Sequence, residues 1–508
     1  MAGTQAALLG IDVGTTGVKA VLVGTDGQVL GEAEVEQDVI VPRPTWSEQH
    51  PESWWQSTKA AVGQVMDATR SLPGPVEVRA IGLSGQMHSS VFLDADHSVI
   101  RPALLWNDSR TTPQCHEITA RLGLDGLRAA VGNLALEGFT APKVLWLREH
   151  EPRNYERLRT LLLAKDYVRY RLTGELATEP SDAAGTILYD VRERRWSQEV
   201  TDALEIERDI LPTVVESTEI SGVVTAAIAG ELGLSPGTRV VGGGADNAAG
   251  AVSSGVVTAG RLQSSIGTSG TMLTPTQEPC VETEMRLHTF CHCVPGQWYL
   301  MGTILSAGNS LRWLRNTLGS QQSYDSLIDE AESVDIGADG LVFLPYMAGE
   351  RTPHNDSNAR GVFFGLHLGH LPGHLTRAVL EGVCFALRDS LELIRTLGVS
   401  VESITAIGGG ARSRVWRQIQ ADVFNLPVAT VSPGGGPAYG SAVLAAVGAG
   451  HFGSVQEAVG TWIHADEIVE PEPDAARVYD QLYGLYRTFY PSLKERFAHA
   501  ASLAGELS

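Results

Sequence analysis

The chain opens with apolar runs separated by short polar turns. Two runs, ALLGIDV and VKAVLV, fall within residues 7–24, and residues 25–36 alternate apolar and polar positions. Asp26-Gly27 between such stretches is a strong signal for a hairpin turn. The pattern predicts three consecutive strands joined by tight turns over residues 7–36.

Further along the chain the period changes. Residues 51–72 begin with proline and continue as a helix-forming sequence with two tryptophans. Residues 78–94 predict two strands joined by a short loop. Residues 402–428 predict a strand, a glycine turn at Gly408–Gly410 and a helix, and the turn leaves room for a planar group such as an adenine.

One hairpin pattern occurs twice. Residues 260–274 predict strand, GTSG turn and strand, which repeats the GTTG turn near the start of the chain. A chain of 508 residues exceeds the usual limit of a single core. The repeat therefore predicts two related domains, each with one turn rich in N–H and hydroxyl donors.

Composition limits the partners. Hydrophobic residues make up 43% and charged residues 19%, and the formal net charge is −21. Such an acidic chain argues against nucleic acid or an anionic membrane, so a phosphorylated ligand must be held by backbone N–H groups and a metal ion. No apolar run approaches the roughly 18 residues of a membrane span, and the start lacks the basic region of a signal peptide. Five cysteines make no disulfide framework. We expect a cytoplasmic protein.

Two local patterns lack the context that a ligand site requires. His288, Cys291, His292 and Cys293 lie in HTFCHCV, but the cysteines are only two positions apart on one strand face, so we interpret them as buried strand residues. Residues 448–453, GAGHFG, match G-x-G-x-x-G but follow an Ala-rich helix, which predicts a helix end and a loop. The sequence contains no G-x4-G-K-[ST] motif, which excludes a P-loop protein.

One acid stands apart in VVGGGADNAAGAV (240–252). The glycines Gly242–Gly244 let the backbone approach a ligand closely. Asp246 follows them with few polar neighbours in sequence, which predicts that its partner is a bound molecule.

Several motifs together resemble a known family. Asp12 with GTTGVK, the GTSG turn and AIGGGARS are similar to the phosphate and adenosine loops of actin-like ATPases. Residues 138–150, GFTAPKVLWLREH, and residues 361–381, GVFFGLHLGHLPGHLTRAVLE, are similar to the two signatures of the FGGY carbohydrate kinases. The resemblance runs over about residues 7–490. It implies an α/β fold of two ribonuclease H-like domains with an interdomain catalytic cleft.

The resemblance also implies which part of the site each domain contributes and which residues bind ATP. Residues 1–252 would hold the sugar, the first phosphate loop and Asp246, and residues 253–508 the second phosphate loop and the adenosine loop. Asp246 is expected to be the general base for a hydroxyl nucleophile, because phosphoryl transfer needs little other covalent help. Asp12 is expected beside Mg²⁺, directly or through water. The residues expected at ATP are Thr15, Thr16, Gly267, Thr268, Gly308, Arg312, Gly409, Gly410 and Arg414.

Shorter motifs indicate the acceptor. Residues 82–94 place Met87-His88 where glycerol kinases have Arg-Glu, and together with LLWNDSRT (104–111) and WSEQHPESWW (46–55) this resembles family members that act on D-xylulose. The residues expected to contact the sugar are Met87, His88, Trp106, Asp108, Asp246 and Asn247. The expected reaction converts ATP and D-xylulose to ADP and D-xylulose 5-phosphate, in xylose catabolism.

Other functions stay open at this point. A related kinase would act on ribulose, gluconate or glycerol, and a different class would be a non-enzymatic actin-like nucleotide switch or sugar sensor. Asp246 favours an enzyme, because binding alone needs no base. A homodimer is compatible with the resemblance. The stretch GGGPAYGSA (434–442) departs from the acid-containing sequence of many relatives, which leaves the packing there open.

Overall fold

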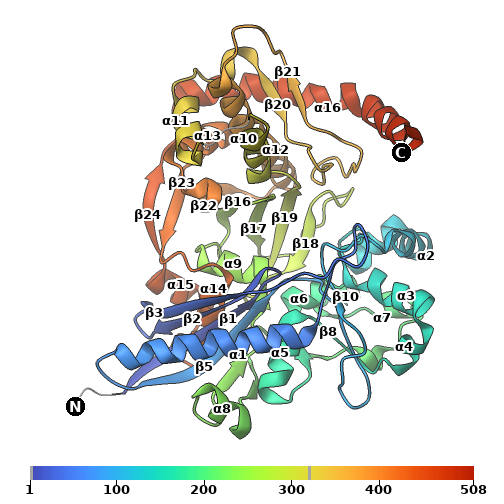
Figure 1. The fold of residues 1–508 in the computed structure, drawn as a ribbon, viewed down its shortest axis with the longest axis vertical. Helices are drawn as coiled ribbons and strands as arrows, with labels where there is room; N and C mark the ends of the chain where they lie inside the picture. The colour runs from blue at the N-terminus through green and yellow to red at the C-terminus, as the bar shows by residue number, and fades with distance from the viewer. Residues whose placement is uncertain (1–3, 319–321, 508) are drawn as a thin grey trace.

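The computed structural model describes residues 4–318 and 322–507, arranged as two halves that each contain a seven-stranded sheet (Figure 1). The first sheet has the order β13-β14-β5-β1-β2-β3, with β15 also beside β5. Its strands are β1 (Gln5–Val13), β2 (Gly17–Gly24), β3 (Val29–Glu36), β5 (Val76–Gly85), β13 (Ile220–Val223), β14 (Arg239–Val241) and β15 (Gly244–Ala245). The second sheet has the order β18-β19-β17-β16-β22-β23-β24. Its strands are β16 (Gly260–Ile266), β17 (Gly270–Thr276), β18 (His288–Cys291), β19 (Trp298–Ile304), β22 (Val401–Gly408), β23 (Val428–Ser432) and β24 (His464–Val469).

The two sheets share one core topology. In the first, β1, β2 and β3 are antiparallel neighbours, while β5 and then β14 extend the other side in parallel. In the second, β16, β17 and β19 are antiparallel, and β22 and β23 extend the sheet in parallel. The repeated hairpin in the sequence therefore marks two halves with the same strand order, and the predicted α/β fold of two related domains is confirmed.

Helices cover the sheets, and short strand pairs join the loops. The helices are α1 (Pro51–Ala68), α2 (Thr112–Ala130), α3 (Thr140–His150), α4 (Pro152–Arg157), α5 (Ala164–Thr173), α6 (Pro180–Ala184), α7 (Gln198–Leu204), α8 (Ala226–Leu232), α9 (Asp246–Ser253), α10 (Gly308–Thr317), α11 (Tyr324–Glu332), α12 (Pro372–Thr396), α13 (Arg414–Phe424), α14 (Gly436–Gly448), α15 (Val455–Trp462) and α16 (Pro473–Leu507). The remaining strands are β4 (Glu48–Gln49), β6 (Val91–Leu93), β7 (Ala103–Leu104), β8 (Thr160–Leu162), β9 (Ala177–Thr178), β10 (Tyr189–Asp190), β11 (Arg195–Trp196), β12 (Thr213–Val214), β20 (Val342–Leu344) and β21 (Val362–Phe364).

Most predicted elements occur. The strands expected in residues 78–94 are β5 and β6, but β6 pairs with β8 and not with β5. The predicted short loop between them carries Met87 and His88 out of the sheet. The HTFC segment is the fully buried strand β18, as predicted. Helix α14 ends at Gly448, which confirms that GAGHFG is a helix end and a loop.

Helix α14 belongs to the second half of the sequence but packs against the first sheet. A Cβ at Gly10 of β1 would lie 1.8 Å from Ala438 O, and one at Gly82 of β5 would lie 1.9 Å from Ser441 O. On its other side, a Cβ at Gly440 would lie 1.9 Å from Ala249 O of α9. The GGGPAYGSA stretch, which differs from the sequence of many relatives, thus forms the start of α14, and its small residues allow close contacts with the first sheet and with α9. The division at residues 252 and 253 stays a prediction, and α14 links the two parts across it.

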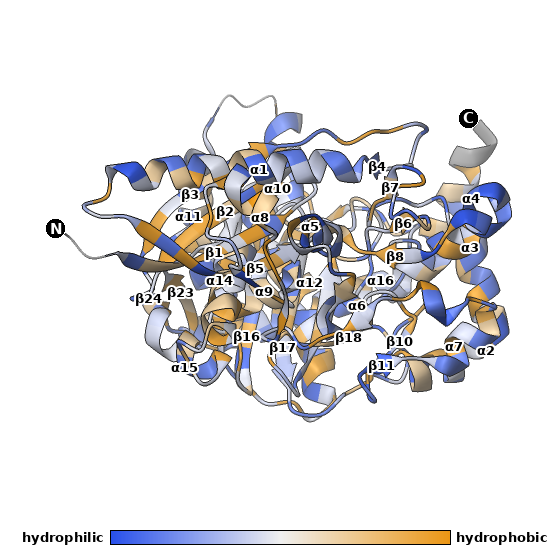
Figure 2. Cartoon of the chain, turned by 90° about the horizontal axis from the view of Figure 1, so that it is seen from below, coloured by the Kyte–Doolittle hydropathy of each residue, from blue (hydrophilic) through white to orange (hydrophobic). Residues whose placement is uncertain are grey.

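The apolar residues line the inside of these layers. Figure 2 shows hydrophobic colour along the central strands and a mixed colour on the covering helix α1. Trp54 and Trp55 of α1 are fully buried against the first sheet. Among the helices in residues 4–318 and 322–507, none is long and apolar enough to cross a membrane.

Candidate active site

Three parallel strand ends bring the predicted acids together. In the sheet, Asp12 of β1 pairs with Ser84 of β5, and Ser84 pairs on its other side with Gly244 of β15. One residue later β1 and β5 end, and β15 passes directly into α9, whose first residue is Asp246. Ligands of open α/β sheets bind outside the carboxyl ends of the strands. The pairing therefore places Asp12 and Asp246 at the edge of the sheet where a ligand site is expected.

Both acids have raised pKa values, and the charge of Asp12 acts on Asp246. Both are partly exposed. Burial of the carboxyl group raises the pKa of Asp12 to about 6. Burial and the nearby charge of Asp12 raise the pKa of Asp246 to about 7, although hydrogen bonds from Asn247 lower it. An acid with a pKa near 7 is suited to exchange protons at neutral pH.

Asp12 also carries a polar atom without a partner. Its Oδ1 is buried and forms no hydrogen bond of normal geometry to any residue that the structure describes, although the nearby Ser84 hydroxyl lowers the pKa of this carboxyl. A buried carboxylate oxygen normally has a donor or a cation beside it. The oxygen chemistry and the missing partner fit a divalent cation or a water bound to one.

His88 lies in the loop after β5 and has an unusual backbone conformation. Its φ is 67°, in the left-handed region that side chains rarely adopt, and such strain concentrates at functional sites. Its Nδ1 donates a hydrogen bond to Gly185 O at 2.6 Å, and its ring meets Phe139 edge-on. Burial and the Lys143 charge hold the pKa of His88 well below its usual value. The ring is therefore neutral at pH 7 and keeps Nε2 as a hydrogen-bond acceptor.

Asn247 joins this loop to the start of α9. Its side-chain amide donates to Asp246 Oδ1 at 3.0 Å and lies 3.6 Å from the sulfur of Met87. Tyr299 Oη of β19, in the other half, lies 3.9 Å from the same sulfur. Met87 is 3% exposed, and its sulfur accepts weak hydrogen bonds from the Asn247 amide of the first half and the Tyr299 hydroxyl of the second, so it connects the two halves.

The first phosphate loop is connected to the predicted sugar residue Trp106. Trp106 Nε1 donates to Thr15 Oγ1 at 2.9 Å, and this hydroxyl donates to Gln86 Oε1 at 2.9 Å. Trp106 is 47% exposed and therefore open to a ligand on its other side. Thr16 is exposed at the tip of the turn. Gln86, the residue before Met87, thus sets the orientation of the Thr15 hydroxyl.

Asp108 is bonded to other residues of the protein. Its carboxylate has no exposed surface and binds the Arg110 guanidinium at 2.7 Å, and it also accepts the Ser47 N–H at 2.6 Å. Arg110 stacks on Trp46. Both oxygens are bonded to the protein in this arrangement, and the direct sugar contact of Asp108 stays a prediction. Asp108 fixes the loop that carries Trp106.

The second half presents the other predicted loops at matching strand ends. Ile266, the last residue of β16, pairs with Gly408 at the end of β22. Gly308 N donates to Gly267 O at 2.8 Å, and Asn309 N donates to Thr268 O at 3.2 Å, so the GTSG turn is held by the start of α10. A Cβ at Gly308 would lie 2.6 Å from Gly267 O, which explains the glycine there.

The predicted adenosine residues lie beside this turn. Gly410 packs against the Ile266 side chain, whereas a Cβ at Gly409 would meet only Ile266 O at 3.7 Å, which leaves space above the turn. Arg414 pairs with Glu467 at 3.3 Å and is largely exposed. Arg312 is exposed on α10, where it binds Asn309. The structure thus groups Gly267, Thr268, Gly308, Gly409 and Gly410 and leaves both arginines at the surface.

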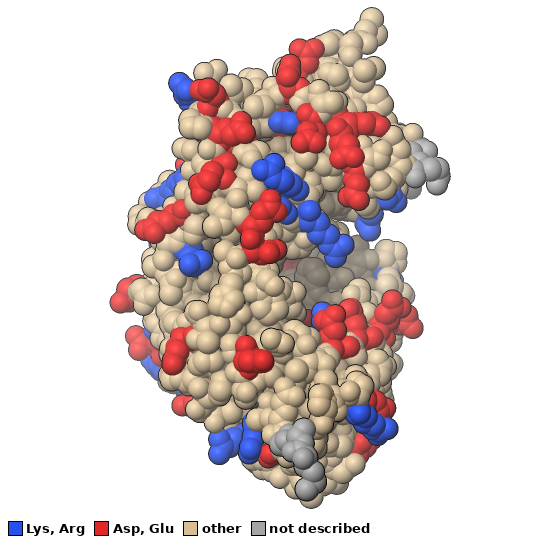
Figure 3. All heavy atoms as spheres, turned by 90° about the vertical axis from the view of Figure 1, so that its left-hand side faces the viewer, with Lys and Arg blue, Asp and Glu red and all other residues tan. Residues whose placement is uncertain are grey.

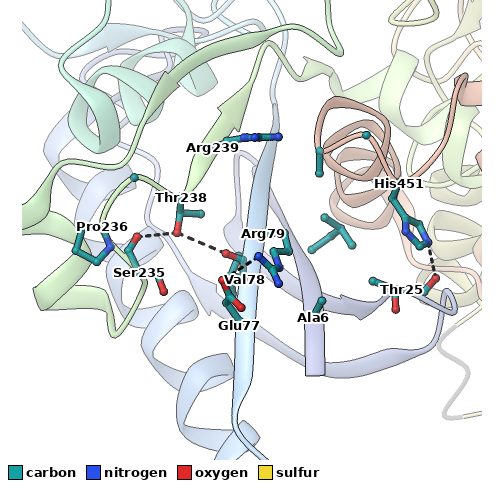
Figure 4. A pocket seen from close by; sticks show the side chains of 14 residues that line it. Ala6, Thr25, Glu77, Val78, Arg79, Ser235, Pro236, Thr238, Arg239 and His451 are labelled. Atoms are coloured by element: carbon teal, nitrogen blue, oxygen red, sulfur yellow. Dashed lines mark hydrogen bonds and ion pairs between the residues drawn. The ribbon is translucent and has the colours of Figure 1, made fainter. Parts of the chain in front are cut away.

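The surface is hollowed between the two halves (Figure 3). One cavity of about 350 Å³ is lined from the first half by residues that include Glu137 and from the second by Leu305, Glu350 and Arg351. A larger cavity of about 500 Å³ lies at the opposite end of the first sheet, at the amino ends of β1, β5 and β14, with Arg79 and His451 on its rim (Figure 4). The acids lie at the carboxyl ends, so this larger cavity is not the candidate site.

A histidine cluster at the surface also has metal-ligating atoms. Asp339, His367 and His370 offer such atoms within 4.8 Å of one another. His367 Nδ1 accepts Gly369 N–H, and His370 Nδ1 accepts His367 N–H. In protein metal sites the nitrogen that does not bind the metal normally donates a hydrogen bond. The geometry therefore fits a hydrogen-bonded surface cluster better than a metal centre.

Comparisons with known proteins decide the family. The N-terminal domain model of the FGGY family of carbohydrate kinases matches residues 7–253, and its C-terminal domain model matches residues 262–449. The chain belongs to the FGGY family of carbohydrate kinases. Its relatives include the xylulose kinase of Bacillus subtilis, 41% identical over 96% of this chain and 97% of that protein.

Solved structures of this family have the same fold. A "xyloylose kinase" from Brucella ovis is 38% identical, with a TM-score of 0.91 over 96% of this chain and 99% of that one. A gluconate kinase from Lactobacillus acidophilus is 26% identical, with a TM-score of 0.92 over 98% of this chain and 100% of that one. As a family member, this carbohydrate kinase uses ATP and a divalent metal is usual.

One residue of this FGGY kinase site was not assigned from the sequence. Lys143 lies in the first family signature, is fully buried on α3, and donates to His88 O at 2.9 Å and to Gly138 O at 2.7 Å. Burial lowers the pKa of its amine to about 7. A lysine among apolar helix residues is a signal that could have found it, because lysine is almost never fully buried without a partner.

Proposed function

We propose that this FGGY kinase transfers the γ-phosphoryl group of ATP to the 5-hydroxyl of D-xylulose, with Asp246 as the general base. The observation that carries this proposal is that Asp246, an acid with a pKa of about 7, and His88, a neutral hydrogen-bond acceptor, both lie at the carboxyl-end edge of the first sheet. The names of the relatives at about 40% identity support D-xylulose as the acceptor.

In this reaction the substrate hydroxyl gives its proton to the Asp246 carboxylate as its oxygen attacks the γ-phosphorus. Asn247 holds the carboxylate through its amide, and the N–H of Asn247 also donates to Asp246 Oδ1 at 2.7 Å. His88 accepts a sugar hydroxyl at Nε2, and Met87 excludes water from the space between the halves. The turns with Thr15 and with Gly267 and Thr268 supply donors to the phosphates.

We propose Mg²⁺ as the metal, held by Asp12 directly or through water. Bound there, it would neutralise charge on the phosphate oxygens. The partnerless Oδ1 of Asp12 supports this assignment.

An ADP-release assay tests the function. Purified protein is supplied with ATP and with D-xylulose, D-ribulose, gluconate, glycerol or no acceptor, each with and without magnesium. We expect the highest kcat/KM for D-xylulose and strict dependence on magnesium. Gluconate is the second candidate acceptor, because a gluconate kinase has a similar structure. A preference for gluconate would reject D-xylulose as the acceptor but would still agree with a carbohydrate kinase.

The proposal extends to setting and assembly. We propose that the enzyme acts in the cytoplasm, in xylose catabolism, and that it forms a homodimer. Light scattering on the eluting protein measures the assembly directly.

Removing the His88 imidazole is expected to affect the sugar and not the nucleotide. His88→Ala should raise KM for D-xylulose by about 2- to 10-fold, because one net hydrogen bond is worth about 0.5–1.5 kcal/mol. It should also relax selectivity, since a site built to bond a hydroxyl rejects sugars that lack it. KM for ATP should stay within twofold.

The matched control is His464→Ala, at an exposed position on β24. It should leave all constants unchanged. An unchanged KM for D-xylulose in His88→Ala would remove His88 from the sugar site.

Lys143 is expected to act through His88. Lys143→Met keeps the volume but removes both N–H···O bonds, so the strained His88 backbone loses a support. We expect KM for D-xylulose to rise about tenfold by loss of positioning, with KM for ATP unchanged.

Steady-state kinetics on Lys143→Met and on the double variant with His88→Ala test this route. The two losses should not add, because both remove the same contact. Lys59→Met, which loses an ion pair to Glu231 and a contact of the ammonium group with the Trp55 ring, both away from His88, serves as the control. Additive losses would mean that Lys143 acts independently of His88.

A further inference from the structure

The short helix α6 contacts both parts of the sugar site. At its start, Ser181 Oγ accepts the backbone N–H of Ala245, the residue before Asp246, at 2.9 Å. Just after its end, Gly185 O accepts His88 Nδ1–H at 2.6 Å. A Cβ at Gly185 would lie 2.6 Å from that nitrogen, so the backbone itself approaches the ring.

The Ser181 hydroxyl is fully used. Its single proton is directed to the Glu179 carboxylate, with oxygen distances of 2.9 and 2.8 Å, so its lone pair faces Ala245 N–H. Both side chains are completely buried. Glu179 is held in turn by the N–H groups of Ser181 and Asp182, at 2.7 and 2.9 Å.

Buried charges fix this carboxylate in place. Lys165 Nζ lies 3.4 Å from Glu179, 3.0 Å from Asp182 and 2.7 Å from Asp166. Arg169 joins Asp166 at 2.9 Å and also donates to Gly242 O, in the glycine run before Asp246. Removing one partner of such a buried network is costly, so its members are held in one arrangement.

We propose that Ser181 is a positioning residue for Asp246. Its hydroxyl connects the fixed Glu179 carboxylate to the Gly244–Ala245 peptide group, one peptide bond before the base. The N–H that it holds belongs to the residue that caps α9, and Asp246 is the first residue of that helix. The inference rests on the proposed role of Asp246 as the base.

Ser217 provides a matched control. Its Oγ donates to Glu179 Oε2 at 3.0 Å, and it is as completely buried as Ser181. Its hydroxyl makes no bond to the Gly242–Asp246 segment in the described residues. The backbone of Ser217 also holds that segment, because Ser217 O accepts Gly243 N–H at 2.9 Å, but this bond does not use the side chain. Ser217→Ala therefore removes a donor from the same carboxylate and keeps the backbone bond to the segment that carries the base.

The experiment compares Ser181→Ala and Ser217→Ala by steady-state kinetics and by calorimetric binding of D-xylulose. We expect kcat of Ser181→Ala to fall about tenfold, because small misplacements of a reacting group are costly, with the sugar Kd and KM for ATP within twofold. Ser217→Ala should keep kcat within twofold. An unchanged kcat in Ser181→Ala, or an equal loss in Ser217→Ala, would overturn the inference.

A double variant separates positioning from general stability. In an Asp246→Asn background, Ser181→Ala should cost no further activity, because the group that it positions is already gone. A full additional tenfold loss would contradict the inference. If Asp246→Asn itself retains turnover, the base assignment fails, whereas loss in Asp246→Asn with none in Ser181→Ala rejects only the positioning role. Should Ser181→Ala not fold, Ser181→Cys, whose sulfur is a weak acceptor, takes its place under the same criteria.

Discussion

Replacing Asp246 by asparagine is expected to lower kcat by about 10²–10⁴, the usual range for a general base. The amide keeps the size of the side chain but does not take up the proton of the attacking hydroxyl. Binding of D-xylulose and ATP should change little, because the backbone around Asp246 is held by other groups. Steady-state kinetics and calorimetric titration with each substrate measure the two effects separately.

The pH dependence should follow the same group. A base works only when deprotonated, and the pKa of Asp246 is raised to about 7 by burial and by Asp12. We therefore expect wild-type kcat/KM for D-xylulose to fall as the pH drops below about 7. The residual activity of Asp246→Asn should lack this acid limb.

Asp389→Asn is the matched control. Asp389 is also a buried carboxyl with a pKa raised to about 7, but it lies on α12, where Tyr483 donates to it at 2.7 Å. Its removal should leave kcat within twofold. Near-normal turnover of Asp246→Asn with intact sugar binding would exclude Asp246 as the base.

Both variants should share an effect on stability. A carboxyl with a folded pKa above its unfolded value of 3.8 contributes stability that is complete below pH 4 and lost as the pH rises through about 7. At pH 8 each asparagine variant should therefore be more stable than wild type by on the order of 1–2 kcal/mol. A rise of the pKa from 3.8 to about 7 sets an upper limit of about 4 kcal/mol on this gain. At pH 4 the difference should disappear. Denaturant unfolding without ligands at both pH values measures it.

The sequence revealed the acids because their setting is local. Asp246 follows a glycine run that can be recognised within a few residues, and Asp12 was assigned because it and the adjacent GTTGVK resemble a phosphate loop of the family. The repeated GTxG turn likewise predicted two related domains, which the structure shows as two sheets with the same core strand order. These features depend on neighbours in sequence, so a single chain was enough to predict them.

The groups that hold the acids come from distant segments. Lys143 reaches His88 across 55 positions, and Ser181 reaches Ala245 across 64. No local period records such a contact, because it exists only after the sheet edge, α3 and α6 have assembled. Asp108 shows the converse. It looked like a ligand residue beside Trp106, yet Arg110 two positions later already offered it a partner.

Asp12→Asn is expected to have the second largest effect, a loss of about 10²–10³ in kcat at moderate magnesium. The substitution removes the charge that the proposed cation site provides, and cation stabilisation of phosphoryl transfer is worth several kcal/mol. Higher magnesium should restore part of the loss. D-xylulose affinity without nucleotide should stay within twofold, because no predicted sugar contact involves Asp12. Magnesium titrations of kcat and calorimetry with the sugar alone provide the measurements.

The same variant has a second expected result that does not depend on the metal. The charge of Asp12 contributes to the raised pKa of Asp246, so its removal should move the acid limb of kcat/KM to lower pH. Glu34→Gln is the control: this exposed carboxylate on β3 also raises the pKa of Asp12 but lies outside the strand ends, so its loss should leave the magnesium dependence intact. Weaker D-xylulose binding with an unchanged magnesium dependence in Asp12→Asn would move Asp12 to the sugar site. Two carboxyl groups that interact do not titrate independently, so removing the Asp12 charge should change the pKa of Asp246. If the acid limb of kcat/KM does not move in Asp12→Asn, the two acids do not interact during turnover.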